Sequence, residues 1–290
     1  MTYATAFPNP GFVDGNSALR PAVLEEPGSA PAIRVKGLGF RVGERTKQPV
    51  DILDCVDLTI RPQEFVSIVG PSGCGKSTLL NFIAGLTPVQ KGCVDIFGLP
   101  PGESQRIGYM FQQHALLPWR TVLRNVELGL ELAGVSAEER RQKALQMLAA
   151  MGLRGFESHY PNELSGGMRQ RASLARTLVA DPSLILMDEP FGALDAQTKI
   201  FIQEMFSHYW EAHRKTVLFV THDLNEAVAL SDRVLVMGAR PGRIIAEHVI
   251  DLPRPRDFNH LVRTPGFTYY VDEIWNDLRV EAAKALQGRP

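Results

Sequence analysis

The sequence predicts an α/β protein with a mixed sheet, an antiparallel β flank and an inserted all-helical subdomain. Three observations predict this class. A glycine-rich loop at residues 70–78 stands between an apolar run and a helical pattern. Two further apolar runs, at 184–187 and 217–220, are continuous, as in parallel strands that are covered on both faces. Between residues 121 and 180 the apolar spacing is helical, which predicts the insertion.

Composition restricts the partners that we expect. The formal net charge of the 290 residues is -1, so the chain lacks the excess of basic residues that is typical of a nucleic-acid-binding protein. The three cysteines share no metal-binding or disulfide spacing, which favours a reducing compartment. The chain does not begin with a basic stretch followed by an apolar one, and no apolar run approaches the ~18 residues of a spanning helix. We therefore expect a cytoplasmic protein without a nucleic-acid partner.

The first hundred residues predict a leader and the antiparallel flank. Residues 1–31 are rich in proline and show no sustained period, which predicts a flexible leader. Strand-like runs at 33–42 and 55–60 are joined by a polar segment, 43–48, that is typical of a hairpin connection. Further short strands are expected at 93–97 and 107–110.

The glycine-rich loop fits the phosphate-binding pattern G-x-x-x-x-G-K-[ST] at every fixed position. Its residues are Gly70, Pro71, Ser72, Gly73, Cys74, Gly75, Lys76, Ser77 and Thr78. The run at 65–69 predicts a buried strand before the loop, and helical spacing follows it, so the motif has the context that it requires. The loop therefore predicts a P-loop NTPase core, although a glycine-rich turn that binds nothing is the alternative.

Each residue type in the loop has a chemical reason. Glycines let several backbone N–H groups point inward as an anion cradle at a helix N-terminus. Lys76 adds a positive charge for the β- and γ-phosphates, and the Ser77 hydroxyl is a suitable ligand for Mg²⁺. Cys74 fills a free position, so we expect it to pack rather than to react.

The helical insertion has a recognisable internal start. Residues 136–139, Ser-Ala-Glu-Glu, form a capping box, and the helix that it begins is expected to stop at Gly152.

Two later strands end in polar residues. The run at 184–187 is followed by Asp188 and Glu189, at the sheet edge where open α/β sheets bind ligands. Asp188 suits a contact to Mg²⁺, and Glu189 can polarise an attacking water. An acidic turn without function is the alternative. The run at 217–220 ends in Thr221 and His222, which brings an imidazole to the same edge.

One further string identifies a resemblance. Residues 164–171, Leu-Ser-Gly-Gly-Met-Arg-Gln-Arg, place Ser165 as a helix N-cap, with Gly166 and Gly167 exposing N–H groups to an anion. With the phosphate loop, Asp188-Glu189 and His222 in this order, the chain from about 33 to 252 resembles the ATP-binding subunit of ABC transporters. That gives an ATP-binding domain at 32–252, with the helical insertion at about 121–180, and a helical tail at 253–290.

The resemblance implies roles and partners. Gln112 would approach Mg²⁺ and the attacking water, so that Ser77, Gln112 and Asp188 surround the metal. Glu189, His222 and Gln112 would be the catalytic residues, with His222 contacting the γ-phosphate of ATP. Asp195 would lie in the loop that crosses a dimer interface. Each ATP would be held between one chain's phosphate loop and Ser165 of the other, so the chain needs a second copy or a close paralogue.

The resemblance is incomplete at the adenine. The family stacks an aromatic residue of the early strand on the base, but Val42 occupies that position here. Phe40, two residues earlier on the same strand face, is the substitute that we expect.

The strings at 108–113, 116–120, 191–198 and 237–244 resemble the group that imports nitrate, sulfonates and taurine. The group implies integral membrane permease subunits and an extracytoplasmic substrate-binding protein, with this chain peripheral on the cytoplasmic face of the inner membrane. Residues 116–119 would dock the permease, unless they pack inside the insertion. Three rival functions share some motifs: a soluble ABC-type ATPase without a permease, a small-molecule kinase and an exporter subunit.

Overall fold

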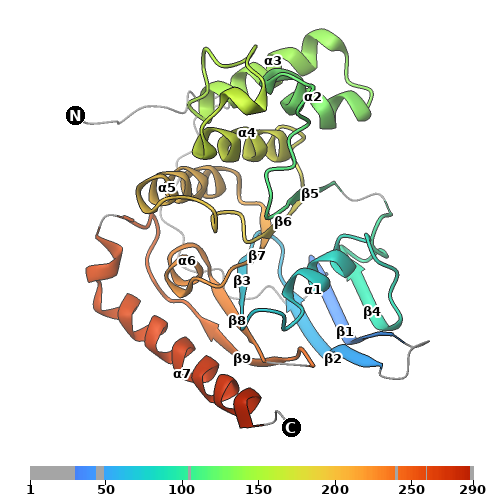
Figure 1. Ribbon diagram of the computed structural model, residues 1–290, viewed down its shortest axis with the longest axis vertical. Coiled ribbons are helices and arrows are strands. Elements are labelled where there is room, and N and C mark those ends of the chain that lie inside the picture. The colour runs from blue at the N-terminus through green and yellow to red at the C-terminus, as the bar shows by residue number, and fades with distance from the viewer. Residues whose placement is uncertain (1–29, 44–48, 104–105, 239–240, 259, 288–290) are drawn as a thin grey trace.

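The computed structural model describes residues 30–43, 49–103, 106–238, 241–258 and 260–287 (Figure 1). The fold is α/β, as predicted, with a six-stranded mixed sheet beside a three-stranded antiparallel one. The expected leader falls almost wholly outside the described residues, as do residues 44–48 of the expected hairpin connection.

The mixed sheet has the strand order β5-β6-β7-β3-β8-β9. All neighbours are parallel except the pair β8 and β9. The strands are β3 (Phe65–Val69), β5 (Ile107–Met110), β6 (Leu184–Asp188), β7 (Thr216–Val220), β8 (Arg233–Met237) and β9 (Ile244–Val249).

The antiparallel flank has the order β2-β1-β4, with β1 (Ile33–Val42), β2 (Val50–Ile60) and β4 (Lys91–Ile96). β2 begins five residues before the start that the sequence predicted. Cys55 has a φ of 49°, and this left-handed residue breaks the alternation of the strand. Because the period is interrupted there, the pattern of residues 50–54 did not join the pattern that follows.

Two cores lie on opposite faces of the mixed sheet. In β7, Val217 and Phe219 belong to one core and Leu218 and Val220 to the other, and all four are fully buried. This double burial explains the continuous apolar run, because both sets of alternating side chains leave water. One face is covered by α1 (Lys76–Ile83) and the antiparallel flank, and the other by α5 (Ala196–His213), α6 (Leu224–Leu230) and α7 (Pro265–Gln287) (Figure 1).

The inserted helices gather at one end of the molecule, above β5 and α5 (Figure 1). They are α2 (Val122–Leu132), α3 (Ala137–Ala150) and α4 (Gly166–Leu178), with the short 3-10 helix η1 (Pro161–Glu163). Hydroxyls of Thr121, Ser136 and Ser165 cap the three α-helices. A second 3-10 helix, η2 (Leu261–Arg263), precedes α7.

No helix in the described part of the chain is long and apolar enough to cross a membrane.

Candidate nucleotide-binding site

The strand order brings four loops to one sheet edge. β5, β6, β7 and β3 are parallel neighbours, so their carboxyl ends meet there. Gln112 follows β5, Glu189 follows β6 and His222 follows β7, while the phosphate loop follows β3. Segments that are 150 residues apart in the sequence therefore surround one place in space.

At two positions of the phosphate loop only glycine fits, because other atoms of the protein lie too close for a side chain. Gly75, which precedes α1, has a φ of 104°, and a Cβ there would lie 2.7 Å from Cδ2 of Leu53. A Cβ on Gly70 would lie 2.6 Å from the carbonyl oxygen of Met237. Glycine at both positions therefore lets the loop follow this path, in which backbone N–H groups can form an anion cradle.

Lys76 is held inside the loop. Its Nζ donates to the carbonyl oxygens of Gly70 at 2.9 Å and Pro71 at 3.1 Å, and the residue is only 5% exposed. The neighbouring thiol of Cys74 is buried, and burial raises its pKa, so it is not poised as a thiolate. The loop thus presents one positive charge, and Cys74 packs as expected.

Ser77 and Asp188 place two oxygens side by side. The Ser77 hydroxyl donates to Oδ1 of Asp188 at 2.9 Å. Burial raises the pKa of Asp188, with Glu189 beside it acting in the same direction, whereas the Ser77 hydrogen bond and Lys76 lower it. A hydroxyl and a carboxylate at this spacing fit Mg²⁺, which takes one or two protein oxygens and completes its shell with water and phosphate.

Glu189 is the point where three loops converge. Its Oε2 accepts from Nε2 of Gln112 at 3.4 Å and lies 3.0 Å from Nδ1 of His222. Its backbone has a φ of 44°, held by an N–H bond to the carbonyl oxygen of Val220. The carboxylate side chain is 21% exposed, so water can reach it. A carboxylate in this position can accept a proton from a water molecule.

Ser165 and Asp195 lie away from this convergence. Ser165 accepts from the N–H of Met168 as the cap of α4, and Asp195 accepts from the N–H of Thr198 as the cap of α5. The hydrogen bonds recorded for the described residues join neither side chain to the phosphate loop. The two caps are near each other, because a Cβ on Gly167 would lie 2.4 Å from Cγ2 of Thr198.

Phe40 is directed toward the interior of the flank. Its ring packs edge-on against that of Phe82, with centroids 5.1 Å apart, whereas Val42 is 39% exposed.

Sequence reasoning missed Gln170, which joins α4 to two of these loops. Its Nε2 donates to the carbonyl oxygen of Pro190, and its Oε1 bonds to Nδ1 of His114. Gln170 is 1% exposed. The available signal was a glutamine inside the string at 164–171, but nothing in the sequence says that this side chain faces inward.

The segment after Gln112 leads to an exposed surface around Trp119, which is 72% exposed, while Leu116 packs against the core. Asn125, fully buried, accepts from the N–H of Leu117 at 2.7 Å and donates to the carbonyl oxygen of Arg120 at 3.0 Å, so the loop is held rigidly.

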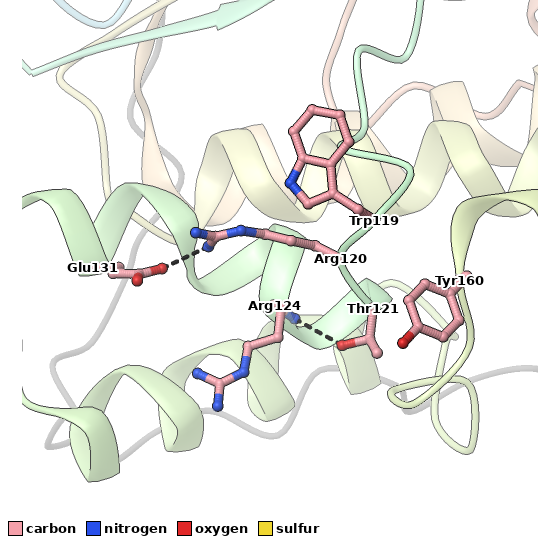
Figure 2. Close-up of a pocket in the computed structure, with 6 residues that line it drawn as sticks. All are labelled: Trp119, Arg120, Thr121, Arg124, Glu131 and Tyr160. Atoms are coloured by element: carbon pink, nitrogen blue, oxygen red, sulfur yellow. Dashed lines mark hydrogen bonds and ion pairs between the residues drawn. The ribbon is translucent and has the colours of Figure 1, made fainter.

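A hollow of about 320 Å³ lies beside this loop (Figure 2). It is lined by Trp119, Arg120, Thr121, Arg124, Glu131 and Tyr160.

The fold and the site define a class. A glycine loop with an enclosed lysine, a hydroxyl–carboxylate pair for a hard cation, and a water-accessible carboxylate beside an imidazole are the parts of a P-loop nucleoside triphosphatase.

Comparisons with known proteins narrow this class. The ABC transporter family model matches residues 53–192. The uncharacterized ABC transporter ATP-binding protein MJ0412 of Methanocaldococcus jannaschii is 48% identical over 241 residues, 82% of this chain and 88% of the relative. The taurine import ATP-binding protein TauB of Rhizobium johnstonii is 44% identical over 237 residues, 79% of this chain and 90% of the relative.

A solved structure agrees with these relatives. The dimeric ATP-binding cassette MJ0796, in a post-hydrolysis state bound to ADP and Pi, superposes with a TM-score of 0.68 at 36% identity, covering 76% of this chain and 100% of that one. The chain belongs to the family of ABC transporter ATP-binding subunits, and it is an ATPase.

Proposed function

We propose that this chain is the ATP-hydrolysing subunit of an importer that takes up a small anionic solute of the nitrate, sulfonate or taurine type. A separate permease spans the membrane, an extracytoplasmic protein delivers the solute, and this chain lies at the cytoplasmic face. The observation that carries the proposal is the convergence of Gln112, Glu189 and His222, because the segment of Gln112 continues into the exposed surface at Trp119. The likeness to a taurine import protein supports the solute class.

ATP binding uses the phosphate loop. The N–H groups of residues 70–78 hold the phosphates, and Lys76 exchanges its carbonyl partners for the β- and γ-phosphates. Ser77, Asp188 and Gln112 would hold Mg²⁺, which would supply positive charge beside the phosphate oxygens. Phe40 is proposed to support the adenine, although its contact with Phe82 uses part of the ring.

Hydrolysis uses the three converging side chains. Glu189 accepts the proton of a water molecule that Gln112 orients in line with the γ-phosphate. His222 lies against Glu189, so a single ring can hold the carboxylate and reach the γ-phosphate. Gln112 and His222 are already in place before charge develops on the γ-phosphate. Groups that need not reorganise during the reaction stabilise a transition state most effectively.

A second chain completes each site. Ser165 and the N–H groups of Gly166 and Gly167 stand at the start of α4, where they can bind the γ-phosphate of ATP on a partner. Asp195 lies in the loop that meets that partner. The partner is an identical chain or a close paralogue, so two ATP molecules lie in one interface and their hydrolysis reopens it.

Co-purification tests the proposal. An affinity-tagged Glu189→Gln chain, drawn with ATP from gently solubilised membranes, should carry a multi-helix permease. Trp119→Ala in the same chain should lose it. Trp275→Ala is the matched control, since that tryptophan is 57% exposed on α7 and should have no effect. The same assembly prepared with the unsubstituted chain, placed in liposomes with ATP and the extracytoplasmic protein, should then take up taurine, another sulfonate or nitrate.

Recovery of the chain only from the soluble fraction, alone or with nucleic acid, would remove the importer assignment and favour an ABC-type ATPase without a permease.

A further inference from the structure

Lys199 lies on α5, one helical turn after Asp195, and its ammonium reaches the turn that carries His222. Nζ lies 3.0 Å from Oδ2 of Asp223 and 2.7 Å from Oε1 of Glu226. The side chains of Lys199 and Glu226 are 21% and 4% exposed. Charges so far removed from water are screened weakly, so this contact is stronger than an ion pair on the surface.

The partners of Lys199 hold the backbone on both sides of His222. Asp223 uses its other oxygen, Oδ1, to cap α6 by accepting from the N–H groups of Asn225 and Glu226. The Thr221 hydroxyl donates to Oε2 of Glu226 at 2.5 Å and also accepts from the N–H of Asp223 at 3.0 Å. Gln203, from α5, donates to Oε1 of Glu226 at 3.0 Å. The two residues that flank His222 are therefore tied to α5 through one cluster.

The orientation of His222 depends on this cluster. Its side chain is 58% exposed, so packing does not fix the ring. What holds the ring is its bond to Glu189 and the position of the backbone turn. The segment from Glu189 to Asp195 runs beside it, because a Cβ on Gly192 would lie 3.7 Å from Cε1 of His222.

These contacts form a closed path. It runs along the chain from Glu189 to Asp195, continues on α5 to Lys199, crosses to Asp223 and returns through His222 to Glu189. A displacement of the Asp195 loop would therefore reach the start of α5 and, through the Lys199 ammonium, the turn that carries His222.

We infer that Lys199 is a positioning residue, which couples the Asp195 loop to the placement of His222 against Glu189. This inference rests on the roles proposed above for Asp195, His222 and Glu189. Lys199 contacts no substrate. It acts because its ammonium holds the carboxylates of Asp223 and Glu226, which follow His222 in the chain. A neutral side chain of the same length would leave these two carboxylates facing each other without a positive charge.

ATPase kinetics of the full-length chain test the inference. Lys199→Met should lower kcat about tenfold or more while ATP affinity changes less than about twofold, because misplacement of a catalytic group by ~1 Å costs up to 10²-fold. Lys199→Arg, which keeps a charged donor for both carboxylates, should recover most of the rate. Asp223→Asn should resemble Lys199→Met, since asparagine still caps a helix but lacks the charge.

Lys215 supplies the matched control. Its side chain is 19% exposed and its Nζ lies 2.7 Å from Oδ1 of Asp181, whose side chain is 67% exposed, so it is a lysine of similar burial in a more exposed ion pair. It precedes β7 at the opposite edge of the sheet. Lys215→Met should keep the wild-type kcat. If kcat falls equally in both variants, the loss in Lys199→Met is explained by a general loss of stability, and the inference is overturned.

A double-mutant cycle separates this inference from the proposed function. If Lys199 acts through His222, Lys199→Met should not lower the rate of a His222→Ala chain any further. A low rate in His222→Ala beside a wild-type rate in Lys199→Met, or fully additive losses, would overturn the inference alone. A wild-type rate in His222→Ala would remove the proposed role of His222, and the inference with it.

Discussion

At the scale of single residues, the site depends on groups that are held by backbone as much as by side-chain contacts. Glu189 adopts a left-handed φ of 44°, which costs a non-glycine residue about 1–3 kcal/mol. The bond from its N–H to the carbonyl oxygen of Val220 keeps it there. A residue that followed β6 in extended geometry would point its side chain to one face of the sheet. The positive φ turns Glu189 toward Gln112 and His222 instead.

Glu189→Gln should separate ATP binding from ATP hydrolysis. The amide keeps the size of the side chain and its bond to Gln112, but it cannot accept a proton, so turnover should fall roughly 10²- to 10⁴-fold. ATP affinity should stay near the wild-type value, because the phosphate loop is unchanged. Steady-state hydrolysis and equilibrium binding of ATP check both parts. Undiminished turnover would assign the base to another residue.

At the scale of the elements, the described part of the tail is joined to the core by buried charge. Arg256 is 3% exposed, and burial, with Arg254 beside it, lowers its pKa. Its Nη1 donates to the carbonyl oxygens of Val228, Ala229 and Ser231 at the end of α6. The oxygens of Val228 and Ala229 belong to the last turn of α6 and carry the negative end of its helix dipole, which compensates the buried guanidinium.

Arg256→Met should therefore destabilise the domain by about 1–3 kcal/mol, the cost of leaving buried carbonyl oxygens without a donor. Urea unfolding measures the change. Arg141→Met, at an exposed position of α3, should change the free energy of unfolding by less than about 0.5 kcal/mol. Equal stability of the two variants would mean that water or another group replaces the donor.

The Lys199 cluster predicts a pH dependence of stability. Burial raises the pKa of Glu226 above its ordinary value of 4.5, while contacts with Lys199 oppose that rise. Lys199→Met removes the opposing charge, so the pKa of Glu226 should rise further, and the pKa of Asp223, which Lys199 holds low, should rise with it. The folded variant then binds protons that the unfolded chain releases between pH 4.5 and the raised pKa.

In that interval the free energy of unfolding of Lys199→Met should fall as the pH rises. The variant should therefore be least stable relative to the wild type above the raised pKa, and the difference in stability should become smaller as the pH is lowered. Urea unfolding from pH 5 to 8 measures the slope. Adding Glu226→Gln should remove most of it, and a deficit that is constant with pH would exclude a buried carboxylate as its source.

The sequence predicts an element well when the contacts that form it join residues close together in the chain, and poorly when they join residues far apart. The phosphate loop, Asp188-Glu189 and His222 could be found because each follows a strand pattern directly, and parallel strands end at one edge. The order of the strands, which brings β5 beside β6 and β7 beside β3, is not local. Neither is the contact of Lys199 with Asp223, which joins residues 24 apart in the sequence. β8 and β9 were also missed.

At the scale of the whole molecule, the two proposed halves of the ATP site lie on separate surfaces of one chain. The phosphate loop and Glu189 stand at the edge of the mixed sheet, whereas Ser165 caps α4 in the inserted helices. Gln170 of α4 bonds to the carbonyl oxygen of Pro190, but the Ser165 hydroxyl itself accepts from the N–H of Met168 within α4. A two-fold dimer that faces the loop of one chain to α4 of the other would complete two equal sites, because the same pair of surfaces meets twice.

Mixing two inactive variants tests that arrangement. Lys76→Ala removes the loop's charge, and Ser165→Asp keeps the helix cap while it repels phosphate. Each variant alone should be nearly inactive. In a mixed dimer, the loop of the Ser165→Asp chain meets the unchanged Ser165 of the Lys76→Ala chain, which restores one complete site, while the other site carries both substitutions.

ATPase activity of the mixture should therefore exceed the sum of the two variants. A mixture of Lys76→Ala with Glu189→Gln is the control, because those residues serve the same chain's site and no mixed dimer regains a complete one. If neither mixture recovers activity, Ser165 serves the nucleotide of its own chain. The two halves would then have to approach each other within one molecule, by a movement of the inserted helices toward the phosphate loop.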